Sequence, residues 1–155
     1  MLEVARLAGD QPVSLAAVAE RTHLSRAYLE QLALALRNAR LVKGVCGKGG
    51  GYRLGREPSE ITVREILEAV MGPIAIVECV EDPTSCMLAE FCECRPVYGL
   101  INQRITDALS SFTLADLLNT ERVAAMRGEL ERGGGGRQEA HRAPALRPGA
   151  VVAKC

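Results

Sequence analysis

At 155 residues, the chain is long enough to bury one hydrophobic core, or one small domain with an appendage. No apolar run approaches the roughly 20 residues of a membrane span, and residues 1–10 lack the basic leader of a secretory signal, which predicts a cytoplasmic protein without a membrane segment. The net charge of 0 hides an asymmetry, because residues 1–60 carry nine Lys/Arg against six Asp/Glu and residues 61–131 carry five against twelve. A mildly basic N-terminal part is compatible with binding a phosphate-bearing partner, although ordinary variation in composition gives differences of this size too.

The first forty residues show helical patterns. Residues 1–8 resemble the end of a helix that Gly9 closes. Residues 14–22 and 25–40 repeat apolar side chains at helical spacing, and each run opens with a serine that can cap it. Two helices joined by a tight turn, the second one longer, are typical of a helix-turn-helix, although ordinary helix pairs produce the same pattern.

Two short β-prone runs follow, at residues 41–45 and 51–54, around a glycine-rich tip at 46–50. This arrangement predicts a β-hairpin, and a hairpin directly after a helix-turn-helix is the wing of a winged helix. Glycines would let the tip come close to a DNA groove, and Lys48 and Arg53 would supply positive charge.

A well-marked helix is expected after the hairpin. Thr62 and Glu65 have the spacing of a capping box, Ile61 and Ile66 have that of a hydrophobic staple, and Gly72-Pro73 is a stop signal. Residues 79–94 show neither helical nor strand periodicity, so we expect a loop there.

The last predicted elements are helical. Pro96 suits the first turn of a long helix whose apolar stripe comprises Val97, Ile101, Ile105, Ala108 and Phe112. A second cap at Thr113 and Asp116 is expected to open a final helix that reaches about Arg132. The glycines that start at Gly133 are expected to end the ordered part of the chain.

These patterns predict a mainly α-helical fold with a small β-hairpin. We expect a winged helix-turn-helix domain over residues 1–72 and a cysteine-rich loop over 73–95. A dimerisation helix and a terminal helix would follow over 96–132, and a disordered tail over 133–155.

Four of the six cysteines fall within sixteen residues, at Cys79, Cys86, Cys92 and Cys94. Soft thiolates at irregular loop spacing bind iron–sulfur clusters or zinc, and a dense cluster of thiols also suits redox chemistry. The chain has no paired C-x₂-C knuckle of the kind that structural zinc prefers. An enzyme with a cysteine nucleophile is disfavoured, because the chain has only two histidines and neither is near these cysteines.

The polar face of the helix at 25–40 could read DNA. It carries Arg26, Tyr28, Glu30, Gln31 and Arg37. Glutamine can pair with adenine, and arginine can pair with guanine or phosphate. By itself this pattern is equally that of a solvated helix face.

Several motifs together resemble the Rrf2 family of winged-helix bacterial transcription regulators, and within it the iron–sulfur cluster regulators. They are YLEQ at 28–31, GKGGGYRL at 47–54, ITV at 61–63 leading to Gly72-Pro73, the cysteine loop with CECRPVY at 92–98, and TLADL at 113–117. The resemblance covers residues 1–118.

The resemblance implies a homodimer, paired along the long helix, that binds a pseudo-palindromic operator in double-stranded DNA. It implies that residues 27–31 read bases and that residues 48–52 contact the minor groove or the backbone. The candidate DNA-binding residues are therefore Ser25, Arg26, Ala27, Tyr28, Glu30, Gln31, Lys48, Gly49, Gly50, Tyr52 and Arg53. The family also implies an iron–sulfur cluster, here expected to be [2Fe-2S], with Cys79, Cys86 and Cys92 as ligands.

The chain departs from the family pattern at three places. The family has most of a first helix before the counterpart of residues 1–5, so we expect a truncated N-terminus. Arg95 stands where the cluster regulators have a histidine as fourth ligand, and Cys94 is a candidate replacement, with a spectator role equally open. Cys46 and Ala27 stand where arginine and serine are frequent, which affects the DNA sequence preference.

The function expected from the sequence is a DNA-binding transcription regulator, not an enzyme, that senses iron–sulfur or redox status through a cluster held by the loop cysteines. One alternative is a cluster-free Rrf2-type regulator that works through thiol chemistry or a bound partner. An alternative from a different class is a zinc-stabilised interaction module.

Overall fold

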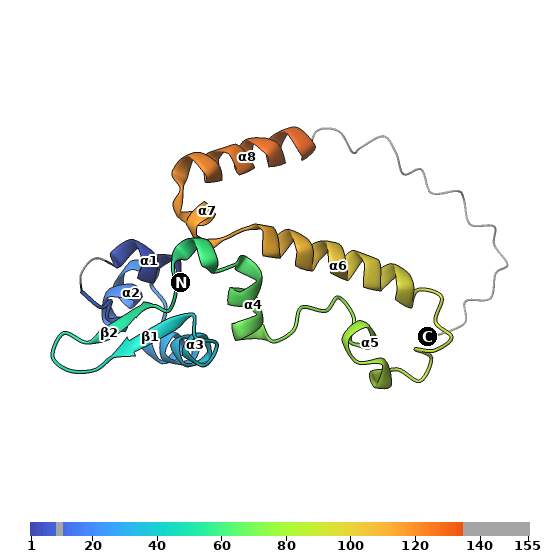
Figure 1. Ribbon diagram of the computed structural model, residues 1–155, viewed down its shortest axis with the longest axis horizontal. Helices are drawn as coiled ribbons and strands as arrows, with labels where there is room; N and C mark the ends of the chain where they lie inside the picture. The colour runs from blue at the N-terminus through green and yellow to red at the C-terminus, as the bar shows by residue number, and fades with distance from the viewer. Residues whose placement is uncertain (9–10, 135–155) are drawn as a thin grey trace. The chain divides into compact units, whose positions relative to one another are not determined.

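The computed structural model describes residues 1–8 and 11–134. Gly9 and residues 135–155 of the tail that we expected to be disordered lie outside the described residues, whereas Gly133 and Gly134, where we expected that tail to begin, are the last residues of a helix. Figure 1 follows the elements along the chain: α1 (Leu2–Leu7), α2 (Leu15–Thr22), α3 (Arg26–Asn38), β1 (Val42–Val45), β2 (Gly51–Leu54), η1 (Pro58–Glu60), α4 (Val63–Met71), α5 (Glu78–Glu81), η2 (Pro83–Ser85), α6 (Arg95–Ser111), α7 (Leu114–Leu118) and α8 (Thr120–Gly134).

The predicted helix-turn-helix is present as α2 and α3. Both helices begin at a serine cap, since Ser14 accepts a hydrogen bond from the backbone N–H of Ala17 and Ser25 accepts one from that of Tyr28. His23 ends α2 in the left-handed conformation, with φ of 56°. This residue turns the chain sharply, so only three residues separate the end of α2 from the start of α3.

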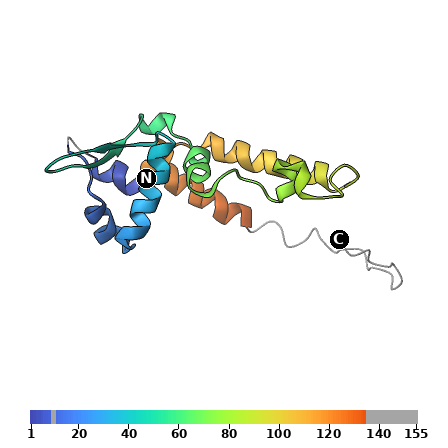
Figure 2. The ribbon, with the colours of Figure 1, turned by 90° about the horizontal axis from the view of Figure 1, so that it is seen from below.

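The predicted hairpin is also present, and it extends beyond the helices in both ribbon views (Figures 1 and 2). Strands β1 and β2 pair antiparallel, with Lys43 opposite Arg53. At the tip Gly49 has φ of 82°, a conformation that favours glycine. At the base Tyr52 exchanges two backbone hydrogen bonds with Val13, so the segment before α2 extends the sheet as an isolated bridge.

The centre of the hydrophobic core joins residues that are far apart in sequence. Leu41, Ile61 and Leu114 are 1%, 0% and 0% exposed and belong to one cluster. The predicted capping box at Thr62 is confirmed, and a second one opens α7 at Thr113. The two caps lie side by side, because the N–H of Leu114 donates to the carbonyl of Ile61. The end of α6 is thereby held against the start of α4.

The cysteine-bearing segment is more structured than the sequence indicated. We expected a loop over 79–94, but it contains the one-turn helix α5 and the 3₁₀ turn η2. Asp82 stabilises this turn, since its carboxylate accepts hydrogen bonds from the backbone and the hydroxyl of Thr84. A helix of four residues is too short to show periodicity in the sequence.

The expected final helix is two helices. The cap at Thr113 opens α7, which ends after Leu118, and Asn119 is extended, with ψ of 111°, before α8 begins. Residues 1–120 form one compact unit, and the described residues 121–134 lie outside it, in a second unit. No helix within 1–8 and 11–134 is long and apolar enough to cross a membrane.

Candidate nucleic-acid interface and cysteine segment

The outer face of α3 presents the predicted DNA-reading side chains to solvent. Residues 25–28, 30 and 31 are all exposed, while Leu29, Ala33 and Leu36 on the other face enter the core. Arg26 and Glu30 form an ion pair, with 3.0 Å from Nε to Oε1. This pair lowers the freedom of both side chains, and its i,i+4 spacing in the sequence would have revealed it. Gln31 lies beside the pair on the same helix.

The wing concentrates positive charge on one face. Lys43 and Arg53 are directly opposite each other in the hairpin register, and both are exposed. Like charges in this position repel each other across the strands, so a bound phosphate would relieve the repulsion. Lys48 adds a third cation at the exposed tip. Lys43 was not among the residues predicted from the sequence, because only the pairing register places it beside Arg53.

Other predicted wing residues have a structural part in the hairpin. Tyr52 is half-buried and packs against the core cluster, and its backbone binds Val13. Gly50 donates a backbone hydrogen bond to Gly47, and a Cβ at Gly50 would lie 2.3 Å from the carbonyl oxygen of Val45. These two residues therefore shape the wing, whatever they contact on DNA, while Gly49 is exposed at the tip.

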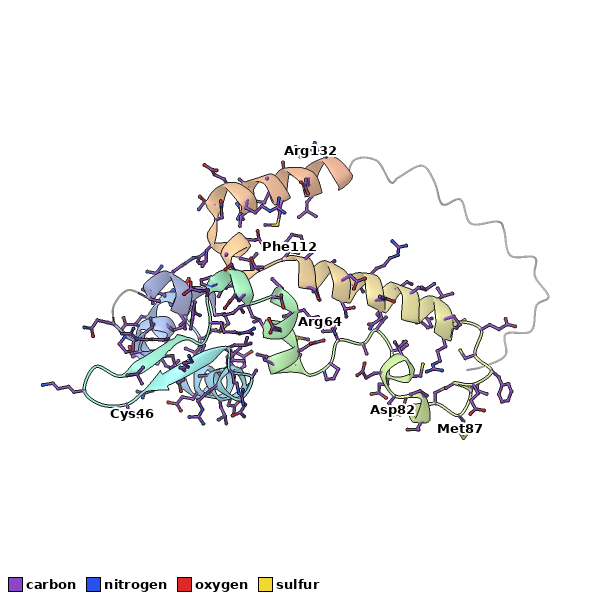
Figure 3. All side chains as sticks on the ribbon, viewed as in Figure 1. Cys46, Arg64, Asp82, Met87, Phe112 and Arg132 are labelled. Atoms are coloured by element: carbon purple, nitrogen blue, oxygen red, sulfur yellow. The ribbon has the colours of Figure 1, made fainter. Side chains whose placement is uncertain are left out.

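The four clustered cysteines lie on different elements of one segment. Cys79 is in α5, Cys86 follows η2, Cys92 lies in the turn before α6, and Cys94 is the N-cap residue of α6. The first three are half-buried, whereas Cys94 is exposed; none of these four is in a disulfide. The fifth described cysteine, Cys46, is exposed in the wing (Figure 3).

Polar contacts hold the segment in its shape. Arg95 donates a hydrogen bond from Nε to the carbonyl oxygen of Cys79, at 2.9 Å, which ties α5 to the first turn of α6. Figures 1 and 2 show α5 beside this end of α6. The hydrogen bonds from the hydroxyl and the backbone of Thr84 hold the pKa of Asp82 below its ordinary value. Arg95 cannot ligate a metal, and in the fold its guanidinium instead tethers α5 to α6.

The cysteine thiols are of the right chemical type to bind an iron–sulfur cluster, but their positions in this structure do not form a site. Thiolates are the usual cluster ligands, and three half-buried thiols lie within fourteen residues. Over residues 1–8 and 11–134, however, no three His, Cys, Asp or Glu side chains are gathered so that they could hold a metal ion. A cavity of about 300 Å³ opens beside the segment, and of the four clustered cysteines only Cys92 lines it. Binding a cluster would require the segment to bring Cys79 and Cys86 toward Cys92.

Helix α6 has its apolar stripe on the outside. Val97, Ile101 and Ile105 are all exposed, and so is Leu100. The buried positions of this helix are polar: Asn102 accepts a hydrogen bond from the backbone N–H of Ile76, and Thr106 donates to carbonyls of its own helix. The predicted stripe is therefore present on α6 from Val97 to Ala108, and this chain leaves that part uncovered. Phe112, which we expected to continue it, is half-buried and lies just beyond the end of the helix.

Comparison with known proteins gives a consistent result. Residues 1–120 match the Rrf2 family, described as an iron-dependent transcriptional regulator. The transcriptional regulator CymR of Bacillus subtilis is 41% identical over 117 residues, which cover 76% of this chain and 80% of CymR. The transcriptional regulator IscR of Photorhabdus laumondii is 37% identical over 131 residues, covering 84% of this chain and 79% of IscR.

Solved structures give the same family. The structure of CymR, the global cysteine regulator of B. subtilis, superposes with a TM-score of 0.60 at 41% identity and covers 76% of this chain and 85% of that one. The structure of T. potens IscR gives a TM-score of 0.59 at 38% identity, covering 76% of each chain. These relatives are regulators and not enzymes, as the sequence predicted, and the winged-helix fold is confirmed. The chain belongs to the Rrf2 family of transcriptional regulators.

Proposed function

We propose that this protein is a dimeric, DNA-binding transcription regulator whose operator affinity depends on chemistry at the cysteine segment 79–94, through an iron–sulfur cluster. The observation that carries the proposal is the placement of four cysteines immediately before α6, with one of them at its N-cap. A change at these thiols acts directly on the start of the helix that we expect to pair the two subunits. Membership in a regulator family disfavours the zinc-stabilised interaction module.

We assign Cys79, Cys86 and Cys92 as the ligands of the cluster, most simply [2Fe-2S]. Arg95 cannot be the fourth ligand, because its protonated guanidinium has no lone pair to offer. Cys94 is the candidate that we propose for this position, and a carboxylate such as Glu90 or Glu93, or a group of the partner subunit, is the alternative. When bound, such a cluster supplies a centre that responds to iron and to oxidation. The contribution of the chain is to link the thiols to α6, since Arg95 joins the backbone of Cys79 to that helix.

Anaerobic reconstitution with iron and sulfide tests the ligand set. The wild-type protein should become coloured, whereas Cys79→Ala, Cys86→Ala and Cys92→Ala should each lose visible absorbance. Cys46→Ala is the matched control, because Cys46 is a free cysteine outside the segment, and it should retain the colour. Equal iron and sulfide content in all five proteins would refute the assignment.

A cluster-free thiol regulator is the second candidate. Two observations favour it. Within the described residues no three potential metal ligands lie close enough together to hold an ion, and the chain is similar to CymR, whose structure is that of a cysteine regulator. The two candidates differ in what controls DNA binding. Under the second, an iron chelator leaves operator affinity unchanged, while a thiol oxidant alters it in the wild type and not in a variant without cysteines at 79, 86, 92 and 94.

DNA contact is proposed for the exposed face of α3 and for the wing. Recognition helices in a dimer enter two major grooves about 34 Å apart, so the operator should be pseudo-palindromic. Gln31→Ala should relax specificity at one base pair of each half-site, by about 1–3 kcal/mol. Lys48→Ala should weaken binding to all sequences and reduce the salt slope by about 1 per subunit, whereas Arg127→Ala in α8 should leave the slope unchanged. An unaltered preference of Gln31→Ala in a randomised-site selection contradicts the reading role.

A further inference from the structure

A polar cavity lies where α4, α5 and α6 meet, away from the recognition helix and the wing. Its volume is about 330 Å³, and its walls include Arg64 and Glu68 from α4, Glu81 from α5, and Asn102, Thr106 and Asp107 from α6. Figure 3 labels Arg64 on α4, above the segment that leads to α5. Cavities of this size hold small metabolites. None of the clustered cysteines lines it, so it is distinct from the proposed cluster site.

The charges on the walls are unequal. Arg64 is paired within its own helix, with 2.8 Å from its Nε to Oε1 of Glu68. The carboxylates of Glu81 and Asp107, both exposed, have no hydrogen-bond or ion-pair partner among the described residues. Two carboxylates without a partner at one cavity favour a ligand that carries an ammonium group.

A buried donor adds a second requirement. Asn102 is only 9% exposed, and its Oδ1 accepts a hydrogen bond from the backbone N–H of Ile76 at 3.1 Å. Its amide NH₂ donates to no group among the described residues. Every fully enclosed side-chain nitrogen or oxygen among the described residues has a hydrogen-bond partner, so this NH₂ group is not fully enclosed. Asn102 lines the cavity, which is the side from which a ligand could reach the group. An NH₂ donor of a largely buried side chain at a cavity wall favours a ligand with an acceptor such as a carboxylate.

We propose that this cavity binds a small zwitterion, a free α-amino acid. Its ammonium group would lie against Glu81 and Asp107, and its carboxylate would accept a hydrogen bond from the NH₂ group of Asn102. Glu81 and Asp107 favour a positive group on the ligand, and Asn102 favours a negative one. A simple amine or a simple carboxylic acid carries only one of these groups. The site deepens the proposed regulation, because a ligand there contacts both α4 of the winged-helix domain and α6, although binding itself does not depend on a cluster.

Isothermal titration of the full chain with each common L-α-amino acid tests the proposal. At least one should bind, and two matched probes should bind at least tenfold more weakly: the amine without the carboxyl group and the acid without the amino group. If no amino acid binds, or if the amine binds as tightly as the amino acid, the proposal is overturned.

Near-isosteric variants locate the site. Asp107→Asn removes one ammonium partner on an exposed position and should weaken amino-acid binding at least tenfold. Asn102→Asp keeps an oxygen that can accept the hydrogen bond from Ile76 but replaces the NH₂ donor with a carboxylate oxygen. At pH 8 this variant should therefore bind the amino acid more weakly and the matched amine more tightly than the wild type does. Glu60→Gln, an exposed carboxylate outside the cavity, is the control and should bind as the wild type does. Wild-type binding by both cavity variants overturns the assignment.

A cysteine variant separates this site from the proposed cluster. The protein with Cys79→Ala, Cys86→Ala and Cys92→Ala should bind the amino acid with unchanged affinity, because none of these residues lines the cavity. Loss of binding in this variant would place the ligand at the cysteines and overturn the inference.

Discussion

The winged-helix region and the segment formed by α5 and α6 use apolar residues in opposite ways. In the first, Leu41, Ile61 and Leu114 are almost completely buried by their own chain. In the second, Met87 is 99% exposed and Leu100 is 66% exposed, while the buried positions of α6 are Asn102 and Thr106. A single chain therefore satisfies the first region, and the second retains an apolar face that needs another surface. This difference supports pairing of two subunits along α6.

The largest expected effect is in the core. Ile61→Ala removes a side chain with no exposure, so the free energy of unfolding should fall by about 2–5 kcal/mol, the range for deleting a buried aliphatic side chain. Chemical denaturation followed by circular dichroism measures it. Ile101→Ala on the exposed stripe of α6 is the control, and it should change monomer stability by less than about 0.5 kcal/mol. Equal losses in both variants would remove the contrast between the two regions.

The next effect is on association. Ile101→Lys places a charge in the middle of the uncovered stripe of α6, so the dimer dissociation constant should rise about 100-fold, which corresponds to about 2.7 kcal/mol. Sedimentation equilibrium measures it. Leu34→Lys in α3 is a matched control, because Leu34 is 50% exposed and Ile101 is 44% exposed. If both variants are still dimers at the protein concentration at which the wild type is a dimer, the interface lies elsewhere.

Helix caps in the two regions provide a smaller test. Thr62→Ala removes the cap of α4 in the core region and should lower the free energy of unfolding by about 1 kcal/mol. Asp82→Ala removes the contacts that shape η2, but it should leave global unfolding unchanged and speed hydrogen exchange only within α5 and η2. Hydrogen exchange read by mass spectrometry separates the two outcomes, and a global loss in Asp82→Ala would show that the segment unfolds together with the core.

The smallest effect depends on pH. Burial works to raise the pKa of Glu65, but hydrogen bonds from the backbone of Thr62, from Arg56 and from the Thr62 hydroxyl outweigh it and hold this pKa below its ordinary value. Since the folded pKa lies below the unfolded one, Glu65 stabilises the protein above about pH 4.3 and loses this contribution as the pH falls through the folded pKa. Glu65→Gln should therefore cost a few tenths of a kcal/mol at pH 7 and almost nothing at pH 3. A constant difference at both values contradicts this, and Glu60→Gln is the matched control.

Local features could be predicted from the sequence alone. The caps at Ser14, Ser25, Thr62 and Thr113 were found because a cap and its partner lie within three residues of each other. The hairpin was found because glycines mark its tip, and the clustering of the cysteines is visible without any fold. In each case the physical cause acts over a few residues, so the spacing in the sequence carries it.

The tertiary structure decided what surrounds these features. Periodicity showed that α6 has an apolar face, but not that this chain leaves the face exposed and turns Asn102 inward instead. The contact of Arg95 with the carbonyl of Cys79 spans sixteen residues, and the polar cavity combines side chains from three helices. The four residues of α5 were missed as well, because they are stabilised by their surroundings and not by an amphipathic pattern. Burial depends on which distant segments meet, and that is a property of the folded chain and not of any local pattern of residues.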